Sequence, residues 1–293
     1  MNDAELAASH AYCHAQTKRH ARSFYFASVA LPPDKKRAAY AVYAFCRYAD
    51  DLVDRAGGGD AAATLAQVSE TFDRMVAGER KEPTFAPAFA WAVTRYGIDK
   101  QPFLDLLKGV GMDLGPVRIA DWPQLRDYCY HVASVVGLMM ARIFELCDEA
   151  GRERAVDLGI AMQLTNILRD VGEDFAMGRV YLPADEMAAA GVGHEALALD
   201  RVSRPLRELL RQQAARAREY YRRAEEGIPL LADDGSQFTV WLMRHVYAGI
   251  LDEIERLDYE VLRQRAKTSL PRKMVLAGRA WRDHRRTRHD PRP

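Results

Sequence analysis

Two clusters of acidic residues have the types and spacing that metal-assisted phosphate chemistry requires. The first is the DDLVD segment at residues 50–54, in which Asp50 and Asp54 are four residues apart and share one face of a helix. Arg47 lies three residues upstream on the same face. Carboxylates this close repel one another unless a cation or solvent screens them. By itself, such a motif is more often a solvated helix end, here just before Gly57.

The second cluster is a polar stripe on a predicted helix over residues 152–174. Its members are Gln163, Asn166, Asp170 and Asp174. Steps of three, four and four residues place them on one face, and apolar residues occupy the other faces. Burying an unpaired carboxylate on such a helix costs free energy, so these groups need partners. The order from amide to carboxylate suits a site that binds metal and phosphate oxygens.

The two helices together predict a magnesium and diphosphate site. Facing each other, they would place about four aspartates around a cavity. Magnesium keeps several waters and binds through one or two carboxylates plus substrate phosphates, which fits this arrangement. Zinc does not fit, because no set of His and Cys ligands accompanies the acids.

The elements that must position these residues are helices. Helical periodicity dominates the 293 residues, and alternating strand patterns are scarce. With no internal repeat or long linker, the chain is predicted to be one all-α domain over residues 1–293, with a basic tail over 277–293. Helices are expected at about residues 5–26, 34–56, 61–77, 84–96, 100–113, 122–147, 152–174, 183–190, 195–198, 205–228, 238–266 and 271–286.

Composition and charge exclude several classes of function. Lys and Arg total 42 and Asp and Glu total 41, so no excess of charge points to nucleic acid. Cys13, Cys46, Cys129 and Cys147 form no CxxC pair and are expected to be buried free thiols. The longest uncharged apolar run falls well short of a membrane span. We therefore expect a cytoplasmic protein, soluble or peripheral on the inner face of the membrane.

Several ordered motifs resemble one known family. They are His20–Phe24 (HARSF), Tyr43–Asp54, Tyr128–Gly137 and Gln163–Pro183. In this order they resemble the squalene/phytoene synthases, which join two prenyl diphosphates head to head. The resemblance covers about residues 10–280 and is strongest to bacterial phytoene synthases. It implies an all-α, class I isoprenoid synthase bundle around a central cavity.

The resemblance also implies a role for each matching residue. Asp50, Asp54, Asp170 and Asp174 would be catalytic and, with Asn166, would hold two or three magnesium ions, or manganese in their place. Tyr128 would stabilise an allylic cation beside the reacting carbons. The residues that would bind substrate are Arg22, Ser23, Tyr43, Arg47, Gln163, Asn166, Arg169, Arg179 and Tyr181. A further diphosphate contact is expected from Arg263, Arg265, Lys267, Arg272 or Lys273, among which the spacing does not choose.

The implied reaction condenses two geranylgeranyl diphosphates to phytoene through a cyclopropylcarbinyl diphosphate. The choice of chain length rests on the small Ser28, which resembles the phytoene synthases. The alternative is a presqualene diphosphate, squalene or dehydrosqualene synthase that uses farnesyl diphosphate. The absence of a GxGxxG segment disfavours NADPH only weakly, because the family binds it without a Rossmann fold. A catalytically silent relative is disfavoured because both acidic motifs are intact.

The expected partners are the prenyl diphosphate substrates, while the oligomeric state stays open. The segment from Arg272 to Pro293 carries eight Lys and Arg against two Asp. It is either a solvated, frayed terminus or a surface that contacts anionic lipid.

Overall fold

The chain folds as a bundle of helices. The computed structural model describes residues 2–56, 61–79, 83–146 and 148–289, while the side chains of residues 52–56, 61–62, 64–65 and 289 lie outside that description. The α-helices are α1 (Asp3–His20), α2 (Arg22–Ala27), α3 (Pro33–Ala56), α4 (Ala61–Val76), α5 (Ala86–Tyr96), α6 (Gln101–Gly111), α7 (Trp122–Cys129), α8 (Val135–Ile143), α9 (Ala150–Ala176), α10 (Ala184–Ala189), α11 (Arg204–Glu225), α12 (Ser236–Arg256) and α13 (Leu270–His289). The shorter elements are η1 (Ser28–Ala30), the π-helical η2 (Tyr130–Ser134), η3 (His194–Leu197), η4 (Ile228–Leu230), β1 (Val117–Arg118) and β2 (Arg179–Val180).

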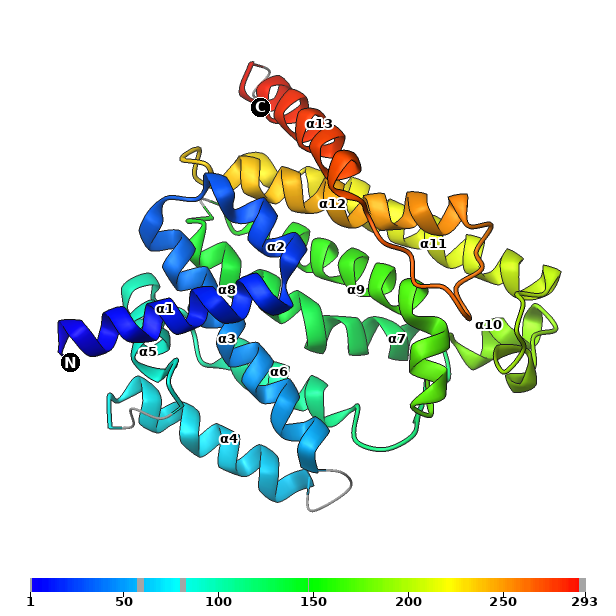
Figure 1. Cartoon of the computed structure of the whole chain (residues 1–293), viewed down its shortest axis with the longest axis horizontal. Helices are drawn as coiled ribbons and strands as arrows, with labels where there is room; N and C mark the ends of the chain where they lie inside the picture. The colour runs from blue at the N-terminus through cyan, green and yellow to red at the C-terminus, as the bar shows by residue number, and fades with distance from the viewer. Residues whose placement is uncertain (1, 57–60, 80–82, 147, 290–293) are drawn as a thin grey trace.

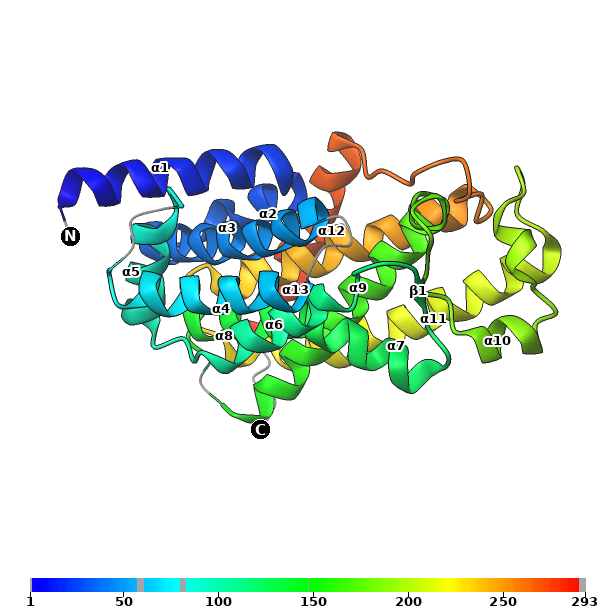
Figure 2. The same ribbon diagram turned by 90° about the horizontal axis from the view of Figure 1, so that it is seen from below.

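The long helix α9 runs through the middle of the molecule (Figure 1) and packs against α8, α11, α12 and η2. Glycines allow two close approaches to α9, one by η2 and one by the loop after α12. A Cβ atom at Gly159 would lie 2.4 Å from the Cα atom of Ser134, and one at Gly172 would lie 2.1 Å from the carbonyl oxygen of Leu262. These contacts fix α9 in the bundle, where the polar stripe of Gln163, Asn166, Asp170 and Asp174 is half-buried. On the outside, α1 lies along α3 (Figure 2).

The predicted all-helical class is confirmed, and most predicted helices are present within a few residues. The segment expected to be one helix over residues 5–26 is instead two helices. Ala21 breaks it with φ −120° and ψ 54°, so that α2 starts in a new direction. The segment over 122–147 contains the π-helical turn η2 directly after Tyr128 and Cys129 and ends at Ile143.

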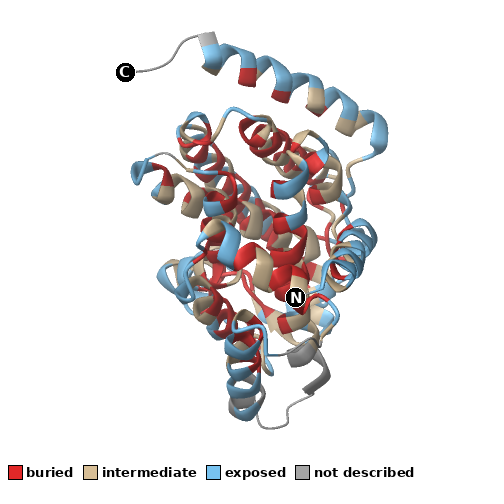
Figure 3. Ribbon diagram, turned by 90° about the vertical axis from the view of Figure 1, so that its left-hand side faces the viewer, coloured by how far each residue is buried: buried red, intermediate tan, exposed pale blue. Residues whose placement is uncertain are grey.

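The C-terminal third differs from the expectation in two ways. The helix predicted over 238–266 ends at Arg256, where Asp258 and Tyr259 adopt positive φ values of 52° and 63°. The final helix α13 continues to His289, so the described part of the basic tail is helical. Figure 3 shows α13 packed on the bundle by one face, with the opposite face exposed.

Two features complete the frame. β1 and β2 form a short parallel pair that the sequence did not predict, with Val117 beside Arg179 and Arg118 beside Val180. Cys13, Cys46 and Cys129 are buried free thiols as expected, while Cys147 lies outside the described residues. Among the helices that the structure describes, none combines the length and apolar character needed to cross a membrane.

Candidate active site

A cavity of about 260 Å³ lies between α9 and the helices around it. Its walls are mostly apolar and come from α2, α3, η2, α8, α11, η4 and α12. α9 contributes residues at steps of three and one, from Gly151 and Arg154 at one end to Gln163 and Asn166 at the other. The cavity therefore has a polar end, next to the acidic part of α9, and a long apolar body.

Two tyrosines complete the polar end of the cavity. Tyr43 comes from α3 and Tyr247 from α12, and both line the cavity with Gln163 and Asn166. Burial raises the pKa of Tyr43 to about 12, with Arg47 opposing the shift. The sequence predicted a role for Tyr43, whereas none of the motifs includes Tyr247. Both phenols thus stay protonated near neutral pH and present hydroxyl groups to this end.

Asp170 is held by two guanidinium groups. Arg169 donates to it from Nε at 2.8 Å, and Arg265 lies 2.9 Å away through its own Nε. The side chain of Asp170 is only 15% exposed. Arg265 is one of five basic residues among which the sequence could not choose. The structure thus places Arg169 against Asp170, and adds Arg265 from the loop after α12.

Asp174 lies one turn further along α9, and its negative charge is less well balanced by nearby positive charge than that of Asp170. Burial raises its pKa to about 7, with the nearby Asp170, Asp113 and Glu173 adding to the shift and Arg179 opposing it. A partly buried carboxylate among like charges is a place where a cation would be stabilised. Among the described residues, no group of three or more His, Cys, Asp or Glu is close enough to hold a metal, and the side chain of Asp54 is not among those described.

The raised pKa of Asp174 predicts a pH dependence of stability in the metal-free protein. The folded protein holds a proton at Asp174 below about pH 7, whereas the unfolded chain releases it near 3.8. The stabilising contribution is therefore complete below about pH 4 and is lost as the pH rises through 7. We expect the melting temperature of the wild type, relative to Asp174→Asn, to fall between pH 5 and pH 8. Melting in EDTA measures this, and parallel profiles for the two proteins would contradict it.

The DDLVD segment lies at the end of α3 with its basic partner beside it. Arg47 pairs with Asp51, at 2.6 Å, and Asp50 is exposed. The Nε atom of Arg47 is buried and has no hydrogen-bond partner among the described residues. A buried donor of this kind is costly unless a ligand accepts from it. Arg47 is therefore suited to bind an anion at the polar end.

A second basic group reaches the predicted substrate residues Arg22 and Ser23. Lys273, in the first turn of α13, donates from Nζ to the Ser23 hydroxyl oxygen at 3.3 Å. Burial, followed by the nearby Arg22 charge, lowers the pKa of Lys273. A partly desolvated ammonium beside another cation favours an anionic ligand. Lys273 therefore joins Arg265 as a residue that only the three-dimensional structure could select.

Asp113 organises the third part of the site, and the sequence did not point to it. Its two carboxylate oxygens accept hydrogen bonds from the hydroxyls of Tyr128 and Tyr181, at 3.0 and 2.6 Å. The rings of these tyrosines stack with centroids 4.8 Å apart, and Arg179 donates to the Asp113 carbonyl oxygen at 3.2 Å. No motif marks Asp113, which follows the end of α6 by two residues.

Tyr128, which was expected to stabilise an allylic cation, lies in the hydrogen-bonded group around Asp113. It is buried, and burial followed by the charge of Asp113 raises its pKa, so the phenol is protonated. Tyr128 is not among the described residues that line the cavity. Its place beside the reacting carbons remains a prediction.

This arrangement of an apolar cavity, a polar helix stripe and flanking basic residues agrees with the sequence comparisons. The sequence profile of the squalene/phytoene synthases matches residues 17–272. The chain belongs to the squalene/phytoene synthase family. The family and the fold class predicted from the sequence motifs are thereby confirmed.

Relatives in the squalene/phytoene synthase family cover most of the chain. It is 38% identical over 281 residues to a phytoene synthase of Arthrospira platensis, covering 91% of this chain and 90% of that protein. It is 37% identical over 287 residues to a 15-cis-phytoene synthase of Synechococcus elongatus, covering 92% of each. It spans 63% of the longer chloroplastic phytoene synthase of Narcissus pseudonarcissus, at 36% identity over 89% of this chain.

Solved structures agree with this family assignment. A dehydrosqualene synthase superposes with a TM-score of 0.87 at 31% identity, covering 96% of this chain and 98% of that one. A squalene synthase of Alicyclobacillus acidocaldarius superposes with a TM-score of 0.78 at 27% identity, covering 88% and 97%. The bundle is therefore shared by family members with different products, so the fold alone does not select the product.

Proposed function

We propose that this chain is a 15-cis-phytoene synthase, a prenyltransferase of carotenoid biosynthesis that condenses two geranylgeranyl diphosphates. The observation that carries the proposal is the single stripe of α9, whose acidic end continues directly into an apolar cavity. Such a cavity suits a long hydrocarbon tail whose charged end lies at the polar end. The similarity to phytoene synthases over about nine-tenths of the chain supports this product.

The polar end fits magnesium, which members of this family use. Asp50, Asp54, Asp170 and Asp174, with the amide of Asn166, would hold the ions. Burial first and the neighbouring carboxylates second raise the pKa of Asp174, so a bound cation would stabilise its charged form. Bound magnesium would act as a Lewis acid that neutralises charge on the departing diphosphate. Oxygen ligands of this kind suit magnesium or manganese and not zinc.

The protein's own residues supply binding, orientation and exclusion of water. Arg47, Arg22 and Lys273 would donate charge-assisted hydrogen bonds to diphosphate oxygens, with Ser23 beside them. Departure of the diphosphate leaves an allylic carbocation, which water would capture. The apolar walls of the cavity keep water away from it while the double bond of the second substrate attacks.

The direct test is a product assay. The purified chain would be incubated with magnesium and labelled farnesyl or geranylgeranyl diphosphate, with and without NADPH. We expect phytoene from geranylgeranyl diphosphate, with no requirement for NADPH. Failure to form the C40 triene would reject the proposal, and squalene or dehydrosqualene from farnesyl diphosphate would favour the alternative.

Ser28, on which the choice of chain length rested, lies one layer behind the cavity. It is fully buried, and its hydroxyl lies 2.6 Å from that of Tyr40. The Tyr40 ring in turn packs edge-on against Phe24, which lines the cavity. A larger side chain at residue 28 would therefore push these rings toward the tails.

We expect Ser28→Phe to favour farnesyl over geranylgeranyl diphosphate. Overpacking of a buried position shifts neighbouring side chains, here Tyr40 and then Phe24. The change in the kcat/KM ratio should be about tenfold or more, because even one methylene in an apolar pocket changes this ratio by about 10- to 200-fold. Competition between the two substrates measures it. Ser28→Ala, which adds no bulk, is the control, and an unchanged ratio in Ser28→Phe would contradict the expectation.

We also propose that the protein is cytoplasmic and that α13 holds it on the inner face of the membrane. Its exposed apolar residues are Leu270, Met274, Val275 and Trp281. The helix also carries seven Lys and Arg against one Asp. An exposed apolar strip flanked by positive charge is suited to the surface of anionic lipid.

Binding to lipid vesicles tests the role of α13. We expect sedimentation with vesicles that contain about a third anionic lipid, and weaker binding at high salt, because screening reduces attraction at the surface. Combining Met274→Ser with Trp281→Ser should lower binding about tenfold. Met177→Ser, which removes an equally exposed apolar side chain elsewhere, is the control. Equal binding of all three proteins would argue against this surface.

A further inference from the structure

The apolar end of the cavity is closed by a charged side chain. Arg154 lines the cavity together with Leu146, Gly151, Gly227 and Ile228, at the end opposite to Asn166. An arginine is unusual among such neighbours, because its guanidinium must find partners when it leaves water. Its position raises the question of what holds it there.

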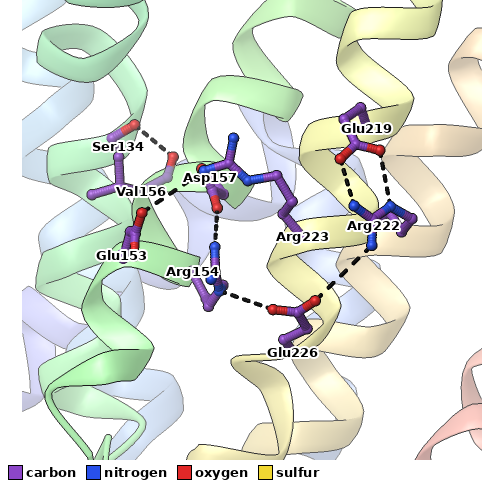
Figure 4. A network of polar contacts seen from close by, with 9 residues as sticks. All are labelled: Ser134, Glu153, Arg154, Val156, Asp157, Glu219, Arg222, Arg223 and Glu226. Carbon is purple, nitrogen blue, oxygen red and sulfur yellow. Dashed lines mark hydrogen bonds and ion pairs between the residues drawn. The ribbon is translucent and has the colours of Figure 1, made fainter.

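Arg154 is held across the gap between α9 and α11 (Figure 4). It donates from Nη1 to Asp157 at 2.9 Å, and its Nε lies 3.2 Å from Glu226. Asp157 is 2% exposed, whereas Glu226 is 45% exposed. The guanidinium thus spans from a buried carboxylate to the surface, and the aliphatic part of Arg154 faces the cavity.

A glycine makes room for this side chain. A Cβ atom at Gly227 would lie 2.4 Å from the Cβ of Arg154, which is closer than such atoms approach. The arginine therefore fills the space that a side chain at residue 227 would take. The Arg154 side chain thus links the lining of the cavity to the exposed Glu226.

A second arginine in the same network allows a role in joining α9 to α11 to be distinguished from a role in lining the cavity. Arg223, from α11, lies 3.0 Å from Asp157 and 3.8 Å from Glu153. It shares the buried carboxylate with Arg154 but is not among the described residues that line the cavity. If the network served only to join α9 to α11, the two arginines would be equivalent.

The distance along α9 matches one substrate length. Asn166 and Arg154 are twelve residues apart, so they are about 18 Å apart along the helix axis at 1.5 Å per residue. An isoprene unit adds four chain bonds, or roughly 5 Å at ordinary carbon–carbon bond lengths. Four units, roughly 20 Å, therefore reach Arg154, three units stop roughly 3 Å short of it, and five units, roughly 25 Å, would extend past it.

We infer that Arg154, held by Asp157 and Glu226, is the stop that limits the length of the prenyl tail in this cavity. This inference rests on the proposed function, because it takes a prenyl diphosphate as the ligand. Removing the side chain opens the cavity toward the surface beside Glu226. A tail with five isoprene units then fits, while tails with three or four units keep the contacts that they had.

The test compares Arg154→Ala with its matched control Arg223→Ala. Calorimetry would measure the affinity of each full-length protein for unreactive thiolodiphosphates that carry farnesyl, geranylgeranyl or farnesylgeranyl tails. We expect Arg154→Ala to raise the affinity for the farnesylgeranyl compound relative to the geranylgeranyl one by about tenfold or more. Arg223→Ala should leave this ratio within about twofold of the wild type. Equal ratios in the two variants would overturn the inference.

Loss of Arg154 also leaves the buried Asp157 with one arginine, which could destabilise the fold. The test therefore includes a second pair of variants. If Arg154→Ala does not fold, Arg154→Ala and Arg223→Ala would each be made separately in an Asp157→Asn background, which removes the buried charge. The same difference in ratios is expected there, and its absence would also overturn the inference. The binding assay needs no turnover. A wild type that binds these compounds but forms no hydrocarbon would therefore reject the proposed function and leave the test of Arg154 intact.

Discussion

Replacing Asp170 with alanine is expected to lower the rate of phytoene formation by about 100- to 1000-fold, the usual loss when a group that stabilises transition-state charge is removed. Asp170 lies in the middle of the acidic part of α9, between Asn166 and Asp174. Its removal leaves the guanidiniums of Arg169 and Arg265 without their shared carboxylate. Their positive charges would then oppose a cation at this place instead of supporting one.

The measurement is the rate at saturating geranylgeranyl diphosphate over a series of magnesium concentrations. Asp148→Ala is the matched control, because Asp148 is an exposed aspartate at the other end of α9 that accepts from the backbone nitrogen of Ala150. That variant should lose about 1 kcal/mol of stability at most and retain its rate. A normal rate in Asp170→Ala would remove this residue from the metal site.

The parts of the site that the sequence predicted are those that depend on local periodicity. Asn166, Asp170 and Asp174 share a face because a helix repeats every 3.6 residues, and this holds wherever the helix lies. The same reasoning placed Arg47, Asp50 and Asp54 on one face of the helix that contains them. Both clusters were therefore visible before any tertiary contact was known.

The parts that the sequence could not predict depend on contacts between distant segments. Arg265 reaches Asp170 from the loop after α12, and Lys273 reaches Ser23 from α13, nearly the whole chain away. Five basic residues in this stretch were equivalent by spacing, and only the path of the backbone after Arg256 distinguishes them. The break at Ala21 is a further example, since no Gly or Pro marks it.

Asp113 was missed for another reason. It lies outside a helix, so no periodic pattern includes it, and its partners Tyr128 and Tyr181 are 15 and 68 residues away. The π-helical turn η2 follows Tyr128, and the β1–β2 pair brings Arg179 close. Neither element has a strong sequence signal. Residues in sites built from short irregular elements are therefore the hardest to predict from the sequence.

Asp113→Asn is expected to lower the rate about 10- to 100-fold, the scale of loss when reacting groups are slightly misplaced. The carboxylate accepts from both tyrosine hydroxyls at once, whereas an amide offers one acceptor oxygen and one donor nitrogen. One buried hydroxyl would lose its partner, at a cost of about 1–3 kcal/mol. The stacked rings and the adjacent Arg179 would then shift relative to Asp174. Steady-state rates with geranylgeranyl diphosphate measure the effect.

A double-mutant cycle with Tyr128→Phe separates positioning from a loss of stability alone. If Asp113 acts through Tyr128, the two changes together should cost little more than the larger one, because groups in one hydrogen-bond network are not additive. Asp105→Asn, in the nearby α6, removes an exposed carboxylate that bonds only Gln101 among the contacts described, and should leave the rate unchanged.

The charge of Asp113 provides a second measurement. Neutralising Asp113 should lower the pKa of Asp174, so the pH dependence of stability should move to lower pH. Additive losses with no such movement would show that Asp113 only stabilises the fold.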